Sequence, residues 1–133
     1  MHDHQPPRIL LIDNDESMLA AVSTRLEFHG YQCVTACSGA QGISVFSGKP
    51  TDLVITDINM PGGDGLTVVR ELRKLSEVPI IVCTGFRDHY WDEIHCLPNV
   101  SVVRKPCETS HLMELVETEL VLAGVELPSN EAA

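Results

Sequence analysis

The sequence predicts an α/β fold: a doubly wound (βα)5 unit in which five parallel strands form one sheet, with helices on both faces. Three observations support this prediction. Short apolar runs alternate along the chain with segments of helical periodicity, as in successive right-handed βαβ crossovers. Most of these runs are continuously apolar, which is typical of strands buried on both faces. The chain has 133 residues, 44% of them hydrophobic, which is enough apolar material for one core.

Strands are expected where an apolar run stops at charged or turn-forming residues. Arg8-Ile-Leu-Leu-Ile12 is the first such run. The second run is more polar, which suits a strand at the edge of the sheet. A turn-rich segment, 59–65, follows the third run. The predicted strands are 8–12, 31–36, 53–56, 79–83 and 100–103.

Helices are expected between these strands, each starting at a capping residue. Asp15 or Ser17 starts the first helix, and Gly30 ends it. Ser38 caps the second helix. Thr109 or Ser110 caps the last one. The apolar positions of the five predicted helices lie within 18–26, 43–46, 66–75, 87–97 and 112–120.

Composition excludes several classes of protein. Nine Lys and Arg residues stand against 19 Asp and Glu, and the net charge of −10 disfavours direct binding to nucleic acid or to anionic membranes. No apolar run approaches the ~18 residues of a membrane span, and the polar N-terminus is unlike a secretory signal. Five cysteines without a CxxC pair cannot all form disulfides, so the reducing cytoplasm is the expected location.

The chain is expected to form one domain between two tails. Residues 1–7 are predicted to be a disordered N-terminal tail, 8–124 the folded domain, and 125–133 a C-terminal tail or linker. No helix-turn-helix, ATPase loop or diguanylate signature follows residue 124. The chain is therefore either a stand-alone domain or the N-terminal piece of a longer protein.

Chemically useful side chains follow four of the predicted strands. Asp13, Asn14 and Asp15 follow the first strand, and Asp57 ends the third. The later strands are followed by a hydroxyl and an ammonium, those of Thr84 and Lys105. Ligands of open α/β sheets bind at the carboxyl ends of the strands. Clustered carboxylates attract a hard cation, for which Mg²⁺ is the natural candidate, and a hydroxyl and a Lys beside that cation would cradle a phosphoryl group.

Four segments resemble the receiver domain of two-component response regulators, the CheY-like family. They are Ile9-Leu-Leu-Ile-Asp-Asn-Asp-Glu16, Asp52-Leu-Val-Ile-Thr-Asp-Ile-Asn-Met-Pro-Gly-Gly-Asp-Gly65, Pro79-Ile-Ile-Val-Cys-Thr-Gly85 and Val103-Arg-Lys-Pro106. The resemblance covers about residues 8–123, and the Asp57-x-x-Met-Pro-x-x-Asp-Gly run is its most specific part. It implies a flavodoxin-like fold with strand order 2-1-3-4-5.

The resemblance also implies a role for individual residues. Asp57 matches the aspartate that accepts the phosphoryl group, Thr84 the hydroxyl that bonds to it, and Lys105 the lysine that pairs with it. The implied metal ligands for Mg²⁺ are Asp13, Asn14, Asp57 and the backbone carbonyl of Asn59. Asn14 replaces the second acid of the family's pair, so either Asn14 or Asp15 is the second ligand. Val102 stands where many receivers have Tyr or Phe.

The implied function is that of a phosphorylatable switch rather than a turnover enzyme. A sensor histidine kinase or a phosphotransfer protein would donate the phosphoryl group, and an output protein or a covalently linked output domain would respond. A phosphorylation-independent interaction module on a receiver fold is an alternative. A small haloacid-dehalogenase-like phosphatase with Asp13 as nucleophile is a third reading, but it needs a further acidic pair after Lys105 and leaves the Asp57 motif unexplained.

Overall fold

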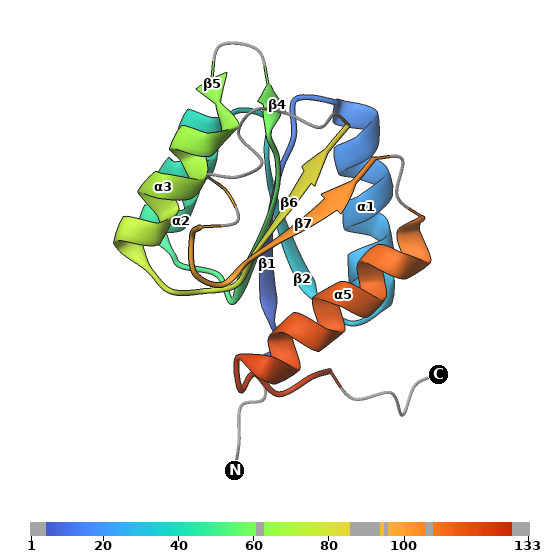
Figure 1. The fold of residues 1–133 in the computed structure, drawn as a ribbon. Helices are drawn as coiled ribbons and strands as arrows, with labels where there is room; N and C mark the ends of the chain where they lie inside the picture. The colour runs from blue at the N-terminus through green and yellow to red at the C-terminus, as the bar shows by residue number, and fades with distance from the viewer. Residues whose placement is uncertain (1–4, 61–62, 86–93, 95, 106–107, 129–133) are drawn as a thin grey trace.

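The computed structural model describes residues 5–60, 63–85, 94, 96–105 and 108–128 (Figure 1). Its main sheet has five parallel strands in the order β2-β1-β3-β6-β7, which is 2-1-3-4-5 along the chain and confirms the predicted flavodoxin-like topology. The strands are β1 (Arg8–Ile12), β2 (Gln32–Ala36), β3 (Leu53–Asp57), β6 (Ile80–Thr84) and β7 (Val100–Arg104).

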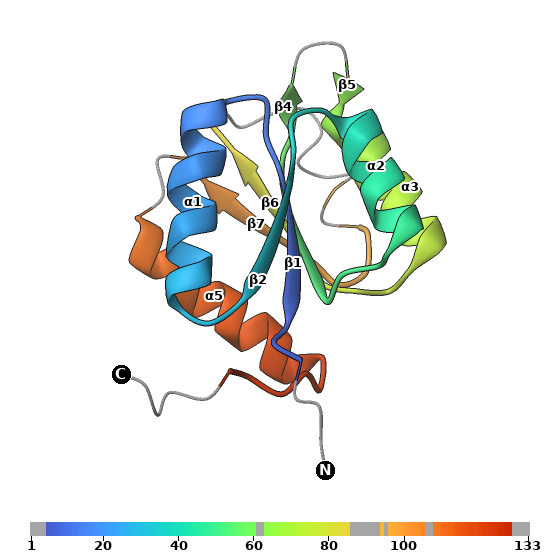
Figure 2. The ribbon, with the colours of Figure 1, turned by 180° about the vertical axis from the view of Figure 1, so that it is seen from behind.

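Four helices cover this sheet within the described residues: α1 (Glu16–Phe28), α2 (Gly39–Gly48), α3 (Gly65–Leu75) and α5 (Thr109–Leu122). Figures 1 and 2 show α1 and α5 on one face and α2 and α3 on the other. The helix expected at 87–97 falls mostly on residues outside the described part of the chain. None of the described helices is long and apolar enough to cross a membrane.

The sheet separates two hydrophobic cores because successive strand residues point to opposite faces. In β3, Leu53 and Ile55 pack with the apolar residues of α1 and α5. Val54 belongs to the other core, with Phe46 of α2 and Leu72 of α3. Among the described residues, the aromatic side chains in these two cores are Tyr31 and Phe46.

Two of the predicted caps are confirmed and one is wrong. The side chain of Asp15 accepts hydrogen bonds from the backbone N–H groups of Ser17 and Met18, and Ser38 accepts one from Gln41. The last helix starts at Thr109, so its N-cap is Glu108, which makes no side-chain capping bond. Thr109 and Ser110 therefore lie inside the first turn and do not cap it.

The segment after α5 folds back against the domain. Gly124 has a φ of +80°, and the N–H of Val125 donates to the carbonyl of Leu120 at 2.9 Å. Val125 and Leu127 then pack against the core beneath α1 and α5. Pro128 lies over Gly30, where an added Cβ would be 2.8 Å from the proline. We name residues 125–128 the C-terminal strap.

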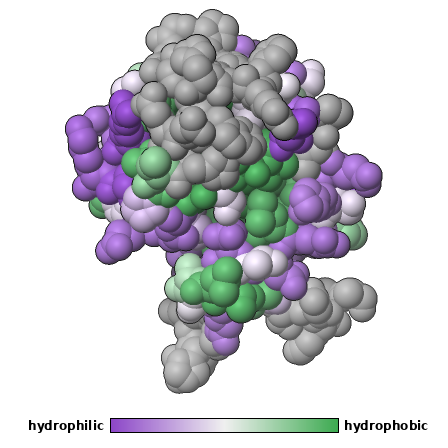
Figure 3. Space-filling model, in the orientation of Figure 1, coloured by the Kyte–Doolittle hydropathy of each residue, from purple (hydrophilic) through white to green (hydrophobic). Residues whose placement is uncertain are grey.

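Apolar residues also reach the surface around the end of α5 (Figure 3), where Val121 and Leu122 are exposed. The C-terminal strap and the end of α5 lie at the amino edge of the sheet, which is the edge formed by the amino ends of the strands. The register of the strands brings all their carboxyl ends to the opposite edge: Asp57 pairs with Cys83, and Thr84 with Arg104. That opposite edge is where the predicted site residues lie.

Candidate functional site

Two aspartates are buried at the carboxyl edge of the sheet. Asp57 is the last residue of the central strand β3 and is 7% exposed. Asp13 directly follows β1, the neighbouring strand, and is 4% exposed. The backbone N–H of Asp13 donates to the carbonyl of Ala36, which fixes the start of the loop after β1. Charges are rarely buried this deeply unless they are paired.

The partner of both carboxylates is Lys105, which follows β7. Its Nζ lies 3.0 Å from Oδ2 of Asp57 and 3.4 Å from Oδ2 of Asp13. Burial on its own would lower the pKa of Lys105, but the hydrogen bond to Asp57 and the charges of Asp57 and Asp13 outweigh burial and raise the pKa above its ordinary value. One ammonium thus neutralises one of two buried negative charges, and the cluster keeps an excess of negative charge.

The loop after β1 presents Asp13 and Asp15 differently. Oδ1 of Asp13 accepts a hydrogen bond from the N–H of Asp15 at 2.9 Å, which leaves Oδ2 directed toward Lys105. The carboxylate of Asp15 is exposed and caps α1. Asn14 is also exposed. Of the three residues that follow β1, the structure therefore brings Asp13 into the charged cluster.

Thr84 lies at the same edge, at the end of β6, and is 2% exposed. Its carbonyl accepts a hydrogen bond of 2.7 Å from the N–H of Lys105. This bond ties the start of the loop after β7 to the end of β6. Lys105 is thereby anchored to β6, the strand that ends with Thr84.

The predicted loop after Asp57 forms a small antiparallel ladder. In it, β4 (Asn59–Met60) pairs with β5 (Gly63–Asp64), so Asn59 stands two residues beyond Asp57 and opposite Asp64. Helix α3 then begins at Gly65, and a Cβ at this position would overlap the backbone of Ile58. Glycine is required because the helix start presses directly on the residue that follows Asp57.

Sequence reasoning missed one residue beside the cluster, Thr56. It is fully buried, and its Oγ1 donates a hydrogen bond of 3.0 Å to the carbonyl of Asp57. In the sequence, Thr56 is the only polar residue between Leu53 and Asp57. The available signal was a hydroxyl directly before the aspartate that ends the strand. Threonine is also a good strand former, so this residue did not stand out.

The donor set fits Mg²⁺, which binds hard oxygen ligands through one or two carboxylates and keeps several waters. Asp13 and Asp57 supply two carboxylates that share one ammonium. No group of three or more His, Cys, Asp or Glu side chains with metal-binding geometry occurs among the described residues. Two carboxylates are within the number that Mg²⁺ usually takes from a protein.

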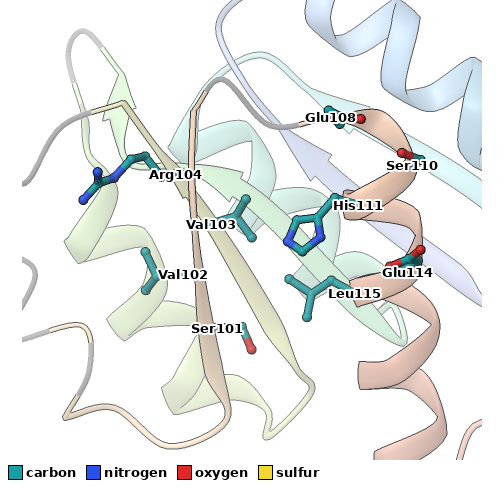
Figure 4. A pocket seen from close by; sticks show the side chains of 9 residues that line it. All are labelled: Ser101, Val102, Val103, Arg104, Glu108, Ser110, His111, Glu114 and Leu115. Carbon is teal, nitrogen blue, oxygen red and sulfur yellow. The ribbon is translucent and has the colours of Figure 1, made fainter.

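A separate pocket of about 660 Å³ lies outside the edge strand β7 (Figure 4). In the figure, Ser101 and Val103 point toward α5, whereas Val102 and Arg104 point to the other side of β7. Val102 packs against the core on the α2 and α3 side. The lining contains none of the charged cluster and consists of Ser101, Val102, Val103, Arg104, Glu108, Ser110, His111, Glu114 and Leu115.

Comparisons with known proteins agree with this geometry. The sequence profile of the response regulator receiver domain matches residues 9–117. A probable transcriptional regulator, ycf27 of Porphyridium aerugineum, is 40% identical over 84 residues, which are 63% of this chain and 35% of that protein. The chain spans about a third of the length of the curated relatives that it matches first.

Solved structures show the same fold. A receiver domain protein from Clostridium thermocellum has a TM-score of 0.78 at 26% identity, covering 89% of this chain and 97% of that one. A CheY-like receiver domain protein from Methanospirillum hungatei has a TM-score of 0.84 at 23% identity, covering 90% and 98%.

The fold and the sequence matches define a receiver domain of two-component systems. The chain belongs to the response regulator receiver domain family.

Proposed function

We propose that this receiver accepts a phosphoryl group on Asp57 in a Mg²⁺-dependent reaction and thereby changes its binding to a partner. The observation that carries the proposal is the buried pair of carboxylates joined through one ammonium, with Nζ of Lys105 3.0 Å from Asp57 and 3.4 Å from Asp13. A structural core gains little from two buried acids that share one base. A site that binds both a metal cation and a phosphoryl group needs these two acids and this base.

In the proposed reaction, a carboxylate oxygen of Asp57 attacks the phosphorus of a phosphohistidine. A P–O bond forms, the P–N bond breaks, and its electron pair stays on the imidazole nitrogen. The product is an acyl phosphate on Asp57. The donor is a sensor histidine kinase or a phosphotransfer protein.

Each neighbouring residue has a separate task in this proposal. The ammonium of Lys105 already contacts Asp57 and would pair with an oxygen of the incoming group. Thr84 would donate its hydroxyl to another oxygen. Asp13, Asp57 and the carbonyl of Asn59 would hold Mg²⁺, with Asn14 or Asp15 as a further ligand. When bound, the metal supplies positive charge that offsets the oxygens of the phosphoryl group.

The cellular role follows from the same proposal. The domain would act as a cytoplasmic switch rather than as a turnover enzyme. Its phosphorylated state would be read by an output protein or by an output domain on the same chain. The match to part of a longer transcriptional regulator supports the second arrangement.

The decisive test is phosphorylation by a small donor. The protein is incubated with Mg²⁺ and phosphoramidate or acetyl phosphate, and its intact mass is measured. We expect the gain of one phosphoryl group in the wild type and in Asp15→Asn, and no gain in Asp57→Asn. Stoichiometric phosphorylation that persists in Asp57→Asn and disappears in Asp13→Asn would instead favour the phosphatase reading. A wild type that takes up no phosphoryl group would favour the phosphorylation-independent module.

A metal titration tests the ligand assignment. Asn14→Asp adds a carboxylate beside Asp13, so we expect Mg²⁺ to bind about tenfold more tightly, an effect of one added charge near the cation. Asp15→Asn should change the affinity little, because the side chain of Asp15 is engaged as the cap of α1. Loss of Mg²⁺ binding in Asp15→Asn would make Asp15, not Asn14, the second ligand.

A further inference from the structure

A fully buried hydroxyl immediately precedes the proposed phosphoacceptor. Thr56 has no exposed surface, and it pairs in the sheet with Ile12 on one side and Val82 on the other. Its neighbours across the sheet are thus aliphatic. Valine has nearly the same shape and would fill the position without a polar group to desolvate. Burying the hydroxyl therefore costs free energy that its hydrogen bond must offset.

That hydrogen bond acts on the peptide group between Asp57 and Ile58. Thr56 Oγ1 donates to the carbonyl of Asp57 at 3.0 Å. The N–H of the same peptide group, on Ile58, donates to the carbonyl of Cys83 at 3.2 Å. Both polar atoms of this peptide are therefore held, one by a side chain of β3 and the other by the backbone of β6.

The start of α3 also confines Ile58, the residue that follows this peptide group. The Cα of Gly65 approaches the backbone of Ile58 so closely that no side chain fits between them. The ladder between β1 and β3 ends at the pair Ile12–Thr56, so pairing with β1 no longer fixes the chain beyond that point. The hydroxyl of Thr56 restrains the backbone at the position where hydrogen bonding to β1 ends.

We propose that Thr56 is a positioning residue for the phosphorylation of Asp57. The inference rests on the proposed function of Asp57. By holding the Asp57–Ile58 peptide, the hydroxyl keeps the Asp57 carboxylate at its place beside Lys105 and at a fixed angle for attack on phosphorus. Attack requires near-contact alignment of the reacting atoms, so a small rotation of this peptide lowers the rate although the carboxylate remains present.

The chain provides a matched control two residues before the start of the same strand. Thr51 is also buried, and its Oγ1 donates to the carbonyl of Leu53 at 3.0 Å. Thr51→Val and Thr56→Val each delete one buried hydroxyl that bonds to a backbone carbonyl. The two variants should therefore lose similar stability, and only Thr56→Val should affect the site.

The experiment measures two quantities in the wild type, Thr56→Val, Thr56→Ser and Thr51→Val. The first is the rate of phosphorylation by phosphoramidate with saturating Mg²⁺. The second is the hydrogen exchange of the Ile58 amide by NMR, relative to the slowest amides of the core. We expect Thr56→Val to slow phosphorylation about tenfold and to lower Ile58 protection by a similar factor, which is the scale of one neutral hydrogen bond. Thr56→Ser, which keeps the hydroxyl, and Thr51→Val should stay within about twofold of the wild type in both.

The two readouts separate the failure of this inference from the failure of the proposed function. If the wild type is phosphorylated and Thr56→Val matches it in rate and in Ile58 protection, Thr56 is an ordinary strand residue. Slow phosphorylation in Thr51→Val as well would assign the effect to stability and would also overturn the inference. If the wild type takes up no phosphoryl group, the proposed function fails, and an Ile58 protection that is unchanged in Thr56→Val would then overturn the positioning role independently.

Discussion

The two edges of the sheet are closed by different kinds of interaction. At the amino edge the chain ties itself together through its backbone and through apolar contacts. Arg8 and Asp52 exchange two hydrogen bonds, from the N–H of Arg8 to Oδ2 of Asp52 and from the N–H of Asp52 to the carbonyl of Arg8, and the C-terminal strap packs beneath α1 and α5. At the carboxyl edge, by contrast, Asp13, Asp57 and Lys105 bury an unbalanced set of charges. One edge is closed by hydrogen bonds and apolar contacts, and the other concentrates buried charge.

Ionisable groups show the same contrast. Near the amino edge, burial raises the pKa of Cys33 to about 12 and also raises that of Tyr31, and nearby acids add to both shifts, so both groups are held neutral. At the carboxyl edge, burial acts on Lys105 in the opposite sense, but the two carboxylates overcome it and keep the lysine charged. Burial is the main cause of the raised pKa values at one edge, whereas partner charges raise the pKa at the other.

The largest expected effect comes from adding a side chain at the start of α3, where no space exists for one. Gly65→Ala places a Cβ into the backbone of Ile58, and because backbone cannot move aside cheaply we expect a loss of about 3 kcal/mol or more in the free energy of unfolding. Gly48→Ala is the control, since nothing lies within 4 Å of its added Cβ. Urea denaturation of both variants tests this. If both variants lose little stability, the backbone of Ile58 can move away from the start of α3 at low cost.

The next effect concerns the charged cluster. Lys105→Met leaves two buried carboxylates without their shared cation, and we expect a loss of about 2 kcal/mol at pH 7, less than for a fully buried pair because the lysine side chain is 31% exposed. Added Mg²⁺ should restore part of this loss, since it supplies positive charge to the same oxygens. Chemical denaturation with and without Mg²⁺ measures both quantities.

Lys74→Met is the matched control for this variant. Lys74 pairs with Glu71 on the surface of α3 at 2.9 Å and is 72% exposed. Such a pair contributes little, so we expect a change within about 0.5 kcal/mol and no dependence on Mg²⁺. If Lys105→Met is as mild as this control, the carboxyl edge is better solvated than the burial of Asp13 and Asp57 implies.

A truncation probes the amino edge. Ending the chain after Gly124 removes the C-terminal strap, including the partly buried Val125 and Leu127, and we expect a loss of about 1–2 kcal/mol in stability, the scale of two half-buried aliphatic side chains. Ending it after Pro128 keeps the strap and is the control. The phosphorylation rate should be the same in both truncated proteins. A slower rate after the first truncation would show that the two edges are coupled.

Much of this contrast could be predicted from the sequence. The buried strands are apolar runs, and polar or charged residues stand at their ends. Topology alone therefore brings Asp13, Asp57, Thr84 and Lys105 to one edge. Asp15 and Ser38 were predicted as caps from their position before a helix, and both make the expected hydrogen bonds. These features depend on local pattern and on strand order, both of which the sequence carries directly.

The remaining features depend on contacts between distant segments. Residues 125–128 were expected to belong to a C-terminal tail or linker, because Val125 and Leu127 are too few to form a periodic pattern. In the structure these two side chains pack against a core surface that only the folded domain provides. The role of Thr56 depends on which way its hydroxyl points. The N-cap at Glu108 was missed because Thr109 and Ser110 are the better capping residue types, and the helix starts one residue earlier than such preferences favour.

The smallest expected effect appears at alkaline pH and tests the contrast between the ionisable groups. Burial, aided by Glu27, raises the pKa of Cys33 to about 12, from 9.0 in the unfolded chain. The neutral thiol therefore contributes stability that is fully present below pH 9 and is lost as the pH rises from 9 toward 12, because the unfolded chain releases this proton first.

Cys33→Val keeps a strand-forming apolar side chain and removes the titration. Between pH 8 and pH 10.5 we expect the wild type to lose about 1 kcal/mol more than Cys33→Val, a value discounted for the partial exposure of Cys33. Urea denaturation across this pH range measures the difference. If the free energy of unfolding falls equally with pH in the two proteins, solvent reaches the thiol and burial does not raise the pKa of Cys33.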